Sequence, residues 1–281
     1  MEIIRIPRIM QDTSLGHILR SRSIGFVPTM GALHDGHLSL MHAARQENDI
    51  VVASVFLNPT QFGPNEDLAD YPQDAEADIK TLRAAGVDYA FVPAPKAMYP
   101  AGFATSIHVG GITGRLCGAF RTGHFDGVAT VVAKLLAIVR PKRAYFGLKD
   151  YQQCQVIKRM AADLNLAVEV VECPTVREHD GLAMSSRNRY LNEAERKAAT
   201  VLHRTLEAAA CEARTGGKTG PQLDGLMAAA LRAEPLVTDI QYAGAFDPDT
   251  LEPVAGTLGE RTLLAVALKI GKTRLIDNLV G

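Results

Sequence analysis

The segment GFVPTMGALHDGHLSLMHAAR, residues 25–45, places His34 and His37 where an apolar run gives way to an amphipathic pattern. Metal binding, phosphate binding and helix capping are three interpretations of this pair. A metal site is disfavoured, because the segment lacks the glutamate of an HExxH helix and two histidines without a nearby cysteine make at most half of a zinc site. Gly31 and Gly36 allow a ligand to approach the backbone, and the amides that begin a helix attract an anion. Phosphate binding is therefore favoured, and capping with packing is the structural alternative.

A second group of donors lies in the segment MSSRNRYL. The hydroxyls of Ser185 and Ser186 and the forked guanidinium of Arg187 suit the oxygens of a triphosphate. Just downstream, Asn192 followed three residues later by Glu195 predicts a helix N-cap. The two interpretations are compatible, because the cap lies beyond the serines.

Lys149, in the segment GLKDYQQ, begins a predicted helix and adds positive charge to an anion site. Together these groups predict a cationic cradle that suits ATP, with Mg²⁺ screening the phosphates and no metal site made of protein side chains. No nucleophile stands beside an obvious base, so the pattern favours displacement at phosphorus through positioning and charge stabilisation. Two other phosphate motifs are excluded. The sequence has no GxGxxG, and ALKIGKT lacks the first glycine of a P-loop, which makes residues 271–273 a predicted turn.

The elements that must position these residues are predicted from hydrophobic periodicity. Short apolar runs alternate with helical patterns over residues 1–175, which predicts a doubly wound, Rossmann-like α/β domain with a parallel sheet. The predicted strands are 23–29, 49–59, 87–93, 143–147 and 166–174, and the predicted helices are 37–48, 74–86, 125–141 and 149–165. Ligands of such sheets bind beyond the carboxyl ends of the strands. The distinctive polar segments follow predicted strands, which favours a single shared site.

The pattern changes near Asp180 and predicts a second, smaller α+β domain over residues 176–281. One long Ala-rich helix is expected over residues 191–215 and another over residues 220–235, followed by two or three strands. This second domain is expected to contribute the serine-basic loop, the segment that carries Ser185, Ser186 and Arg187.

Composition narrows the class of protein. A net charge of −1 over 281 residues disfavours a nucleic-acid partner. The N-terminal residues lack the apolar run of a secretory signal, and the stretch 128–139 is about half of the ~20 residues that a membrane span needs. The cysteines, Cys117, Cys154, Cys173 and Cys211, form no CxxC, which fits a reducing compartment. A cytoplasmic protein without a membrane partner is expected.

The motifs, taken in order, resemble a known family. They are VPTMGALHDGHLSL, NPTQFG, EDLADYP, HFDGVATVVAKL, YFGLKDYQQ and DGLAMSSRNRYL, with RLIDN further along. The strand, the HxGH helix start and the serine-basic loop resemble the class I aminoacyl-tRNA-synthetase-like nucleotidyltransferases, and the whole series is similar to the pantoate–β-alanine ligase (pantothenate synthetase) family. The resemblance implies an ATP-dependent ligase that condenses pantoate with β-alanine through pantoyl adenylate, releasing AMP and pyrophosphate. It also implies Mg²⁺ accompanying ATP, and a homodimer.

The resemblance further implies roles for individual residues. Catalytic roles are implied for His34, His37, Lys149 and Arg187. The implied ATP-binding residues are Met30, Gly31, Ala32, Leu33, His34, Asp35, Gly36, His37, Gly147, Leu148, Lys149, Asp150, Val176, Met184, Ser185, Ser186 and Arg187. Gln61 and Gln153 are implied to bind pantoate, and Gln61 also β-alanine; an amide both donates and accepts, as a hydroxy acid requires. The chain departs from the family at Leu148 and Cys117, where an acidic residue is usual.

Two other hypotheses remain open. A nucleotidyltransferase that passes AMP or CMP to a phosphate acceptor would share the HxGH segment, but its acceptor favours Arg or Lys where Gln61 and Gln153 stand. A non-catalytic nucleotide sensor would keep the cradle without the reaction. ATP–pyrophosphate exchange that requires pantoate distinguishes the ligase from both.

Overall fold

The computed structural model describes residues 1–64 and 66–281, which divide into two compact units. The first unit comprises Met1–Gly110, Arg121–Leu148 and Gln153–Pro174, and the second comprises Gly111–Phe120, Lys149–Gln152 and Thr175–Gly281. The domain division expected from the sequence, 1–175 and 176–281, stays a prediction.

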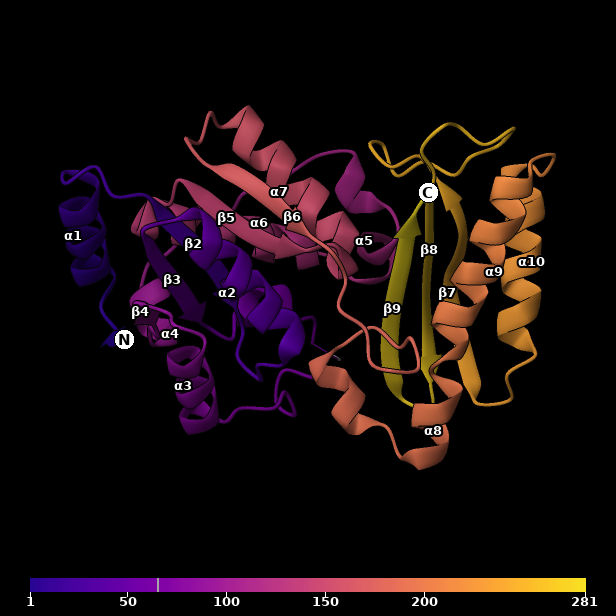
Figure 1. Cartoon of the computed structure of the whole chain (residues 1–281), viewed down its shortest axis with the longest axis horizontal. Helices are drawn as coiled ribbons and strands as arrows, with labels where there is room; N and C mark the ends of the chain where they lie inside the picture. The colour runs from indigo at the N-terminus through magenta and orange to yellow at the C-terminus, as the bar shows by residue number, and fades with distance from the viewer. Residues whose placement is uncertain (65) are drawn as a thin grey trace. The chain divides into compact units, whose positions relative to one another are not determined.

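In the part of the chain that the structure describes, a six-stranded parallel sheet forms the framework of the first unit (Figure 1). Its strands are β1 (Glu2–Ile4), β2 (Ile24–Thr29), β3 (Ile50–Val55), β4 (Tyr89–Phe91), β5 (Arg143–Gly147) and β6 (Glu169–Cys173), in the order β1-β4-β3-β2-β5-β6. From β2 the chain adds β3 and β4 on one side, and it later adds β5 and β6 on the other. The order reverses between β2 and β5, and doubly wound sheets bind ligands beyond the strand ends at such a reversal.

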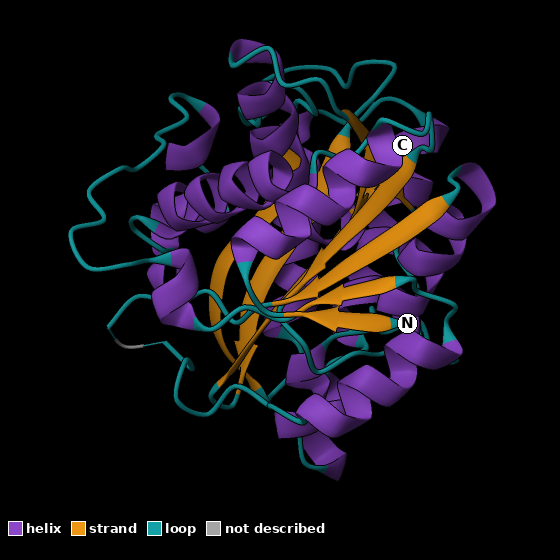
Figure 2. Ribbon diagram, turned by 90° about the vertical axis from the view of Figure 1, so that its left-hand side faces the viewer, coloured by secondary structure: helices purple, strands orange, loops and turns teal. Residues whose placement is uncertain are grey.

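Helices cover both faces of this sheet (Figure 2). They are α1 (Pro7–Ile18), α2 (Asp35–Glu47), α3 (Ala75–Ala84), α4 (Pro95–Met98), α6 (His124–Val139) and most of α7 (Tyr151–Asp163), with the 3-10 helix η1 (Pro59–Gln61). Val27 of β2 packs in one core with Met41 of α2 and Ala53 of β3, and its neighbour Phe26 is buried on the opposite face. Burial on both faces is what the near-continuous apolar runs predict. The predicted doubly wound class is confirmed.

The first strand and the first helix of this unit were not predicted from the sequence. Strand β1 pairs in parallel with β4 at the sheet edge, with Glu2 opposite Tyr89 and Ile4 opposite Phe91. A strand of three residues is too short to show an alternating pattern. Helix α1 begins with a proline at its first position, which is a recognised helix start signal.

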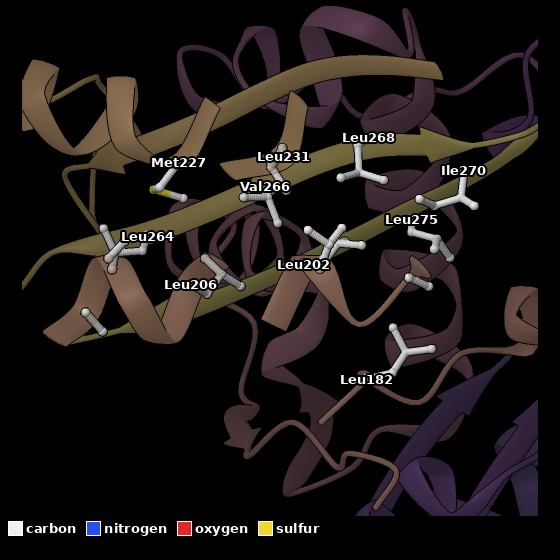
Figure 3. Close-up of a cluster of buried hydrophobic side chains, with 14 of the residues drawn as sticks. Leu182, Leu202, Leu206, Met227, Leu231, Leu264, Val266, Leu268, Ile270 and Leu275 are labelled. Carbon is white, nitrogen blue, oxygen red and sulfur yellow. The ribbon is translucent and has the colours of Figure 1, made fainter. Parts of the chain in front are cut away.

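The second unit contains, among its described residues, a three-stranded antiparallel sheet. Its strands are β7 (Val237–Phe246), β8 (Leu263–Ile270) and β9 (Thr273–Val280). Its helices are α5 (Cys117–Phe120), α8 (Glu193–Ala198), α9 (Val201–Thr215) and α10 (Gly220–Arg232), with the 3-10 helices η2 (Ile112–Gly114) and η4 (Ser186–Tyr190). The 3-10 helix η3 (Leu148–Asp150) begins at Leu148, the last residue of a segment of the first unit, and continues into the second unit. Leu202 and Leu206 of α9 pack with Leu231 of α10 and Leu268 of β8 in one core (Figure 3). The predicted α+β class is confirmed, and Gly271 lies in the β8–β9 turn, as predicted.

The single helix predicted over residues 191–215 is wrong, because the chain forms α8 and α9 with a break at Ala199 and Thr200. At the break the hydroxyl of Thr200 donates to the Lys197 carbonyl at 2.8 Å, and the Leu202 amide bonds to Ala199, three residues back. A hydroxyl that competes for main-chain acceptors tightens and ends a helix. The predicted N-cap is confirmed, since Asn192 and Glu195 form a reciprocal capping box at the start of α8.

Candidate active site

His34 and His37 cap the start of α2. Nδ1 of His34, the N-cap residue, accepts a hydrogen bond from the Gly36 amide at 3.2 Å, and Nδ1 of His37 accepts one from the His34 amide at 3.3 Å. The two ring centroids lie 4.1 Å apart. Imidazoles here take the parts of the hydroxyl and carboxylate in an ordinary capping box. The capping interpretation, which the sequence ranked below phosphate binding, is therefore realised.

Capping is compatible with phosphate binding, because it fixes the nitrogen that carries the hydrogen. A ring nitrogen that accepts a hydrogen bond is unprotonated, so the neutral rings of His34 and His37 carry hydrogen on Nε2. Both rings thus provide an N–H donor at the positive end of the helix dipole of α2, a helix of 13 residues. The spacing of three residues places both donors at one helix end.

A buried carboxylate fixes the loop that precedes α2. Asp78 of α3, 5% exposed, accepts hydrogen bonds from the amides of Ala32 and Leu33 at 3.0 and 2.9 Å. Gly31 adopts a φ of +89°, and a Cβ there would lie 2.7 Å from an Asp78 carboxylate oxygen. A side chain at residue 31 therefore has neither the backbone conformation nor the space that it needs. Asp78 was not predicted from the sequence, although an acidic residue beside the apolar positions of a predicted helix indicates a buried hydrogen-bond acceptor.

Asp78→Ala is expected to lower the free energy of unfolding by about 2–4 kcal/mol, because two buried amides lose their acceptor. Asp74→Ala is the matched control, since Asp74 caps the same helix through the Ala77 amide and is exposed. It is expected to cost about 1 kcal/mol. Denaturant unfolding measures both values. Equal losses in the two variants would contradict a special role for Asp78.

Gln61 lies on η1, beyond the carboxyl end of β3, and is 8% exposed. Its Nε2 donates to the sulfur of Met30 at 2.9 Å, and its Oε1 accepts from Asn58 at 3.1 Å. These contacts join two of the predicted site residues, Met30 and Gln61. An amide has a second N–H and a second lone pair, so beyond its bonds to Met30 and Asn58 among the described residues the group has one donor and one acceptor that suit a ligand. Asn58, which the sequence analysis missed, sets this orientation.

A chain of polar contacts fixes the Gln61 backbone. Arg121 donates to both carboxylate oxygens of Glu66, at 2.7 and 2.6 Å, and to Nε2 of His124 at 2.9 Å. Nδ1 of His124 therefore carries the hydrogen and donates to the Gln61 carbonyl at 2.8 Å. Burial acts to raise the pKa of Glu66, but the hydrogen bonds and charge of Arg121 outweigh it and hold that pKa below its usual value. The carboxylate stays ionised and keeps Arg121 in place.

Helix α6 approaches η1 through a glycine. A Cβ at Gly127 would overlap the Thr60 carbonyl and lie 2.7 Å from the Cα of Gln61. Gly127→Ala is therefore expected to displace η1, to destabilise the protein by about 1–3 kcal/mol, and to raise the KM for the ligand of Gln61. Thermal unfolding and steady-state kinetics measure these effects. In the control Gly225→Ala, within α10 and with open space at the Cβ position, stability should rise by roughly 0.5–1 kcal/mol.

Lys149 lies in the 3-10 turn η3 that follows β5 and leads into α7. Its side chain is 20% exposed, and its Nζ lies 3.9 Å from the carboxylate of Asp150. Of the two glutamines that follow, Gln152 is 5% exposed, accepts from the Cys117 amide and donates to two carbonyls. Its amide is used within the fold, and Gln153 is left as the ligand-binding candidate of the pair.

Residues 176–184 form a short hairpin that carries two predicted ATP-binding residues at its base. The Met184 amide donates to the Val176 carbonyl at 3.0 Å, and Arg177 pairs with Ala183 in an antiparallel bridge. The turn uses Gly181, whose φ of +91° favours glycine. Val176 and Met184 are thus side by side, as a shared role requires.

The serine-basic loop follows directly. Ser185 is the N-cap of η4, and its hydroxyl accepts from the Arg187 amide at 3.3 Å. Asn188, within η4, donates to Glu178 at 2.8 Å and to the Ala183 carbonyl at 3.1 Å. These bonds fasten the loop to the hairpin. Arg187 therefore lies in a turn whose backbone is held by these hydrogen bonds.

Cys117, one of the two departures from the family that the motifs resemble, is buried in the second unit. Its sulfur lies 3.1 Å from the Tyr242 hydroxyl and accepts from Nη2 of Arg274 at 3.3 Å, while Nε of Arg274 donates to Gln241 at 2.8 Å. Burial raises the pKa of Tyr242, so its hydroxyl keeps the proton. The Cys117 sulfur and the Gln241 amide oxygen thus accept two hydrogen bonds from a guanidinium for which a carboxylate would be the usual partner.

The predicted site residues divide between the two units. The first unit holds Met30–His37, Gln61, Gly147, Leu148 and Gln153, and the second holds Lys149, Asp150, Val176 and Met184–Arg187. Within the first unit, Met30–His37 follow β2, and Gly147 ends the adjacent strand β5 with Leu148 directly after it. Both segments therefore start at the reversal of the sheet, where a ligand is expected.

Comparison with known families decides the family. The family model of pantoate-beta-alanine ligase matches residues 2–280. The chain belongs to this family. Among pantoate–β-alanine ligases, the pantothenate synthetases of Thermodesulfovibrio yellowstonii and Moorella thermoacetica are each 54% identical to it over 280 residues; the match covers the whole chain and 99% and 98% of those proteins. The resemblance stated from the motifs is confirmed.

Solved structures of pantoate–β-alanine ligases share the fold. The pantothenate synthetase of Thermus thermophilus is 48% identical, with a TM-score of 0.93 and 99% of each chain covered. The pantoate-beta-alanine ligase of Francisella tularensis, in a complex with beta-gamma ATP and beta-alanine, is 35% identical, with a TM-score of 0.80 and 100% of this chain and 97% of that one covered.

Proposed function

We infer that this chain is an ATP-dependent ligase that condenses pantoate with β-alanine to pantothenate. Membership of the pantoate–β-alanine ligase family carries this conclusion. In the first step a pantoate carboxylate oxygen attacks the α-phosphorus of ATP, which forms pantoyl adenylate and releases pyrophosphate. In the second, the amine of β-alanine attacks the acyl carbon, AMP leaves with the electron pair of the broken bond, and the ammonium proton is lost to solvent.

Adenylation needs donors at the phosphates, and the proposed donors come from both units. His34 and His37 provide Nε2–H groups at the start of α2, and the capping bonds that fix their tautomer support this role. We propose that Lys149 and Arg187 balance the charge that grows on pyrophosphate, which is where such groups lower the barrier. The remaining proposed ATP contacts are Met30–Leu33, Asp35, Gly36, Gly147, Leu148, Asp150, Val176, Met184, Ser185 and Ser186.

Pantoate is proposed to bind Gln61 and Gln153. The buried Gln61 amide, oriented by Asn58 and Met30, supports this assignment, because its remaining donor and acceptor match a carboxylate and a hydroxyl. β-Alanine is proposed to bind near Gln61 as well. An uncharged amide suits two carboxylate substrates, since it does not repel either.

Pantoate-dependent exchange of radioactive pyrophosphate into ATP tests the function. Exchange that requires pantoate, followed by AMP formation that requires both pantoate and β-alanine, is the expected result. Nucleotide transfer to a phosphate acceptor would instead support the nucleotidyltransferase hypothesis. ATP binding without exchange for any acid would support the sensor.

Mg²⁺ is proposed to arrive with ATP as part of the substrate, because Mg²⁺ in such sites is held largely by phosphate oxygens and water. Within residues 1–64 and 66–281, no group of three or more His, Cys, Asp or Glu side chains could hold a metal ion. Initial rates measured against free Mg²⁺ at fixed ATP test this role. Rates independent of Mg²⁺ would contradict it.

A homodimer in the cytoplasm is the proposed state of the protein. Large apolar side chains at both ends of α1 support self-association, with Ile6 54% and Leu19 77% exposed. Among the described residues the cysteines form no disulfide, which suits a reducing compartment. No helix in the described part of the chain is long and apolar enough to cross a membrane. Sedimentation equilibrium measures the mass, and a monomer would contradict the dimer.

A further inference from the structure

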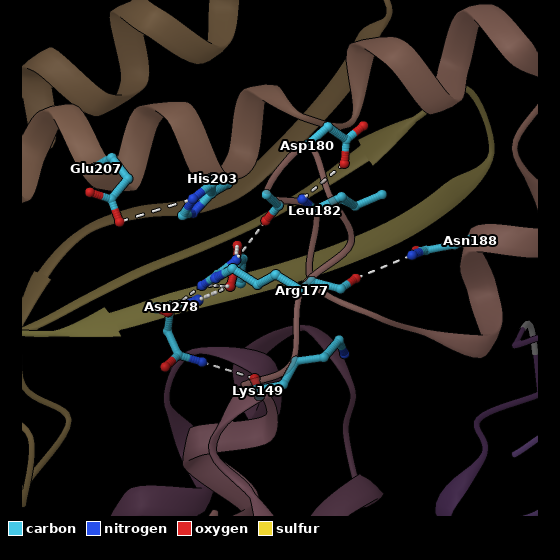
Figure 4. A network of polar contacts seen from close by, with 11 residues as sticks. Lys149, Arg177, Asp180, Leu182, Asn188, His203, Glu207 and Asn278 are labelled. Carbon is cyan, nitrogen blue, oxygen red and sulfur yellow. Dashed lines mark hydrogen bonds and ion pairs between the residues drawn. The ribbon is translucent and has the colours of Figure 1, made fainter. Parts of the chain in front are cut away.

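Asp277 and Asn278 are neighbours on β9, and each contacts a different segment of the second unit that we assign to ATP. Figure 4 shows the contact of Asn278 with Lys149. Successive side chains of a strand point to opposite faces of a sheet. Asp277 shares its face with Leu275, which packs in the core with α9, and Asn278 lies on the other face. One end of one strand therefore reaches both segments.

Asn278 holds the main chain of the Lys149 turn. Its Nδ2 donates to the Lys149 carbonyl at 2.9 Å, and the side chain is buried, with 8% of the residue exposed. The bond goes to the backbone of η3, so it fixes where the turn lies without using the ammonium group. Because this buried hydrogen bond fixes the Lys149 main chain, it restricts the position from which the lysine side chain extends.

Asp277 holds the hairpin that carries Val176 and Met184. Its carboxylate, on a side chain 1% exposed, accepts both Nη1 and Nη2 of Arg177, at 2.6 and 3.0 Å. Arg177 in turn donates to the Gly181 carbonyl in the hairpin turn at 3.0 Å and to the Asn278 carbonyl at 3.4 Å. A bidentate ion pair fixes the orientation of the guanidinium as well as its distance from the carboxylate. Arg177 thus links both the first strand of the hairpin and its turn to β9.

We propose that Asp277 and Asn278 are positioning residues for ATP: from one strand end, Asn278 sets the Lys149 turn and Asp277, through Arg177, sets the hairpin that leads into the serine-basic loop. The inference rests on the proposed function. It adds two residues that touch neither substrate. Their loss is expected to affect the nucleotide and to leave pantoate binding unchanged, because Gln61 and Gln153 belong to the first unit.

Asn278→Asp and Asn278→Ala both remove the donor to Lys149, and the first keeps the shape of the side chain. Each is expected to raise the KM for ATP about fivefold, the value of one net hydrogen bond, with an unchanged KM for pantoate. Asp277→Asn is expected to raise the KM for ATP about tenfold, because it removes a charge from a two-pronged pair, and to lower the midpoint of thermal unfolding. Steady-state adenylation kinetics and thermal unfolding provide these readouts.

Asp224→Ala, which removes the acceptor, is the matched control for destabilisation of the second unit. Asp224 is a partly buried carboxylate of α10 that accepts from the Ala245 amide of β7, away from both segments. It should lower the unfolding midpoint and leave the KM for ATP unchanged. Equal shifts in the KM values for ATP and pantoate, or none in any Asp277 or Asn278 variant, would overturn the proposal. Absence of pantoate-dependent exchange in the unsubstituted protein would instead overturn the proposed function.

Discussion

Replacing His37 by alanine is expected to slow pantoate-dependent ATP–pyrophosphate exchange by about 10²- to 10³-fold. The Nε2–H donor meets charge that develops in the transition state, so the loss should appear in kcat more than in the KM for ATP. Formation of pantoyl adenylate in a single turnover measures the adenylation step directly. A variant that adenylates pantoate at the original rate would exclude His37 from this role.

Two further substitutions separate catalysis from capping at the same position. His37 also accepts the His34 amide through Nδ1, so alanine removes a cap contact together with the donor. In His37→Asn the amide oxygen lies near the position of Nδ1, and in His37→Gln the amide nitrogen lies near that of Nε2. We expect asparagine to restore stability but not the rate, and glutamine to recover part of the rate. A rate that follows stability across the series would make His37 a structural residue.

Replacing Gln61 is expected to raise the requirement for pantoate. Gln61→Ala should raise the KM for pantoate about tenfold, which corresponds to about 1.4 kcal/mol, and leave the KM for ATP unchanged. Gln61→Glu should raise it about a hundredfold, because a nearly buried carboxylate then faces the carboxylate of the substrate. Initial-rate kinetics with varied pantoate measure both effects.

Gln155→Ala provides the control for loss of a glutamine. Gln155 lies on α7, two residues after Gln153, and donates to Glu172 at 3.0 Å. Its replacement should change neither KM. If Gln61→Ala behaved like this control, pantoate binding would have to be assigned elsewhere.

Much of the fold could be predicted because the central strands and the helices after them are long enough to show a period. The turn from β2 into α2 and the capping box at Asn192 are local features, and both were predicted. The edge strand β1 and the break at Thr200 were not. A three-residue strand has no pattern, and a hydroxyl that turns back to its own helix resembles any other threonine in an Ala-rich run.

Site residues could be proposed from the sequence where they stand in a recognisable motif. Residues that position the site through a partner far away in the sequence could not. His37, Lys149 and Arg187 stand in recognisable segments, and their roles remain proposals. Asp78 bonds to Leu33 across 45 residues, and Asn278 bonds to the Lys149 carbonyl across 129. Contacts at such separations are created by folding, and a single sequence does not reveal them. The residues that position the proposed site residues, such as Asp78 and Asn278, are therefore found only from the structure.

The imidazole capping box links nucleotide binding to proton concentration. A ring that accepts a backbone amide through Nδ1 cannot become an imidazolium without losing that contact, and His34 and His37 both accept in this way. In the proposed function the positive charge at the phosphates is assigned to Lys149 and Arg187, and the start of α2 adds the positive end of its helix dipole. Acid that protonates these two rings should therefore release the nucleotide and unwind the first turn of α2 in the same transition.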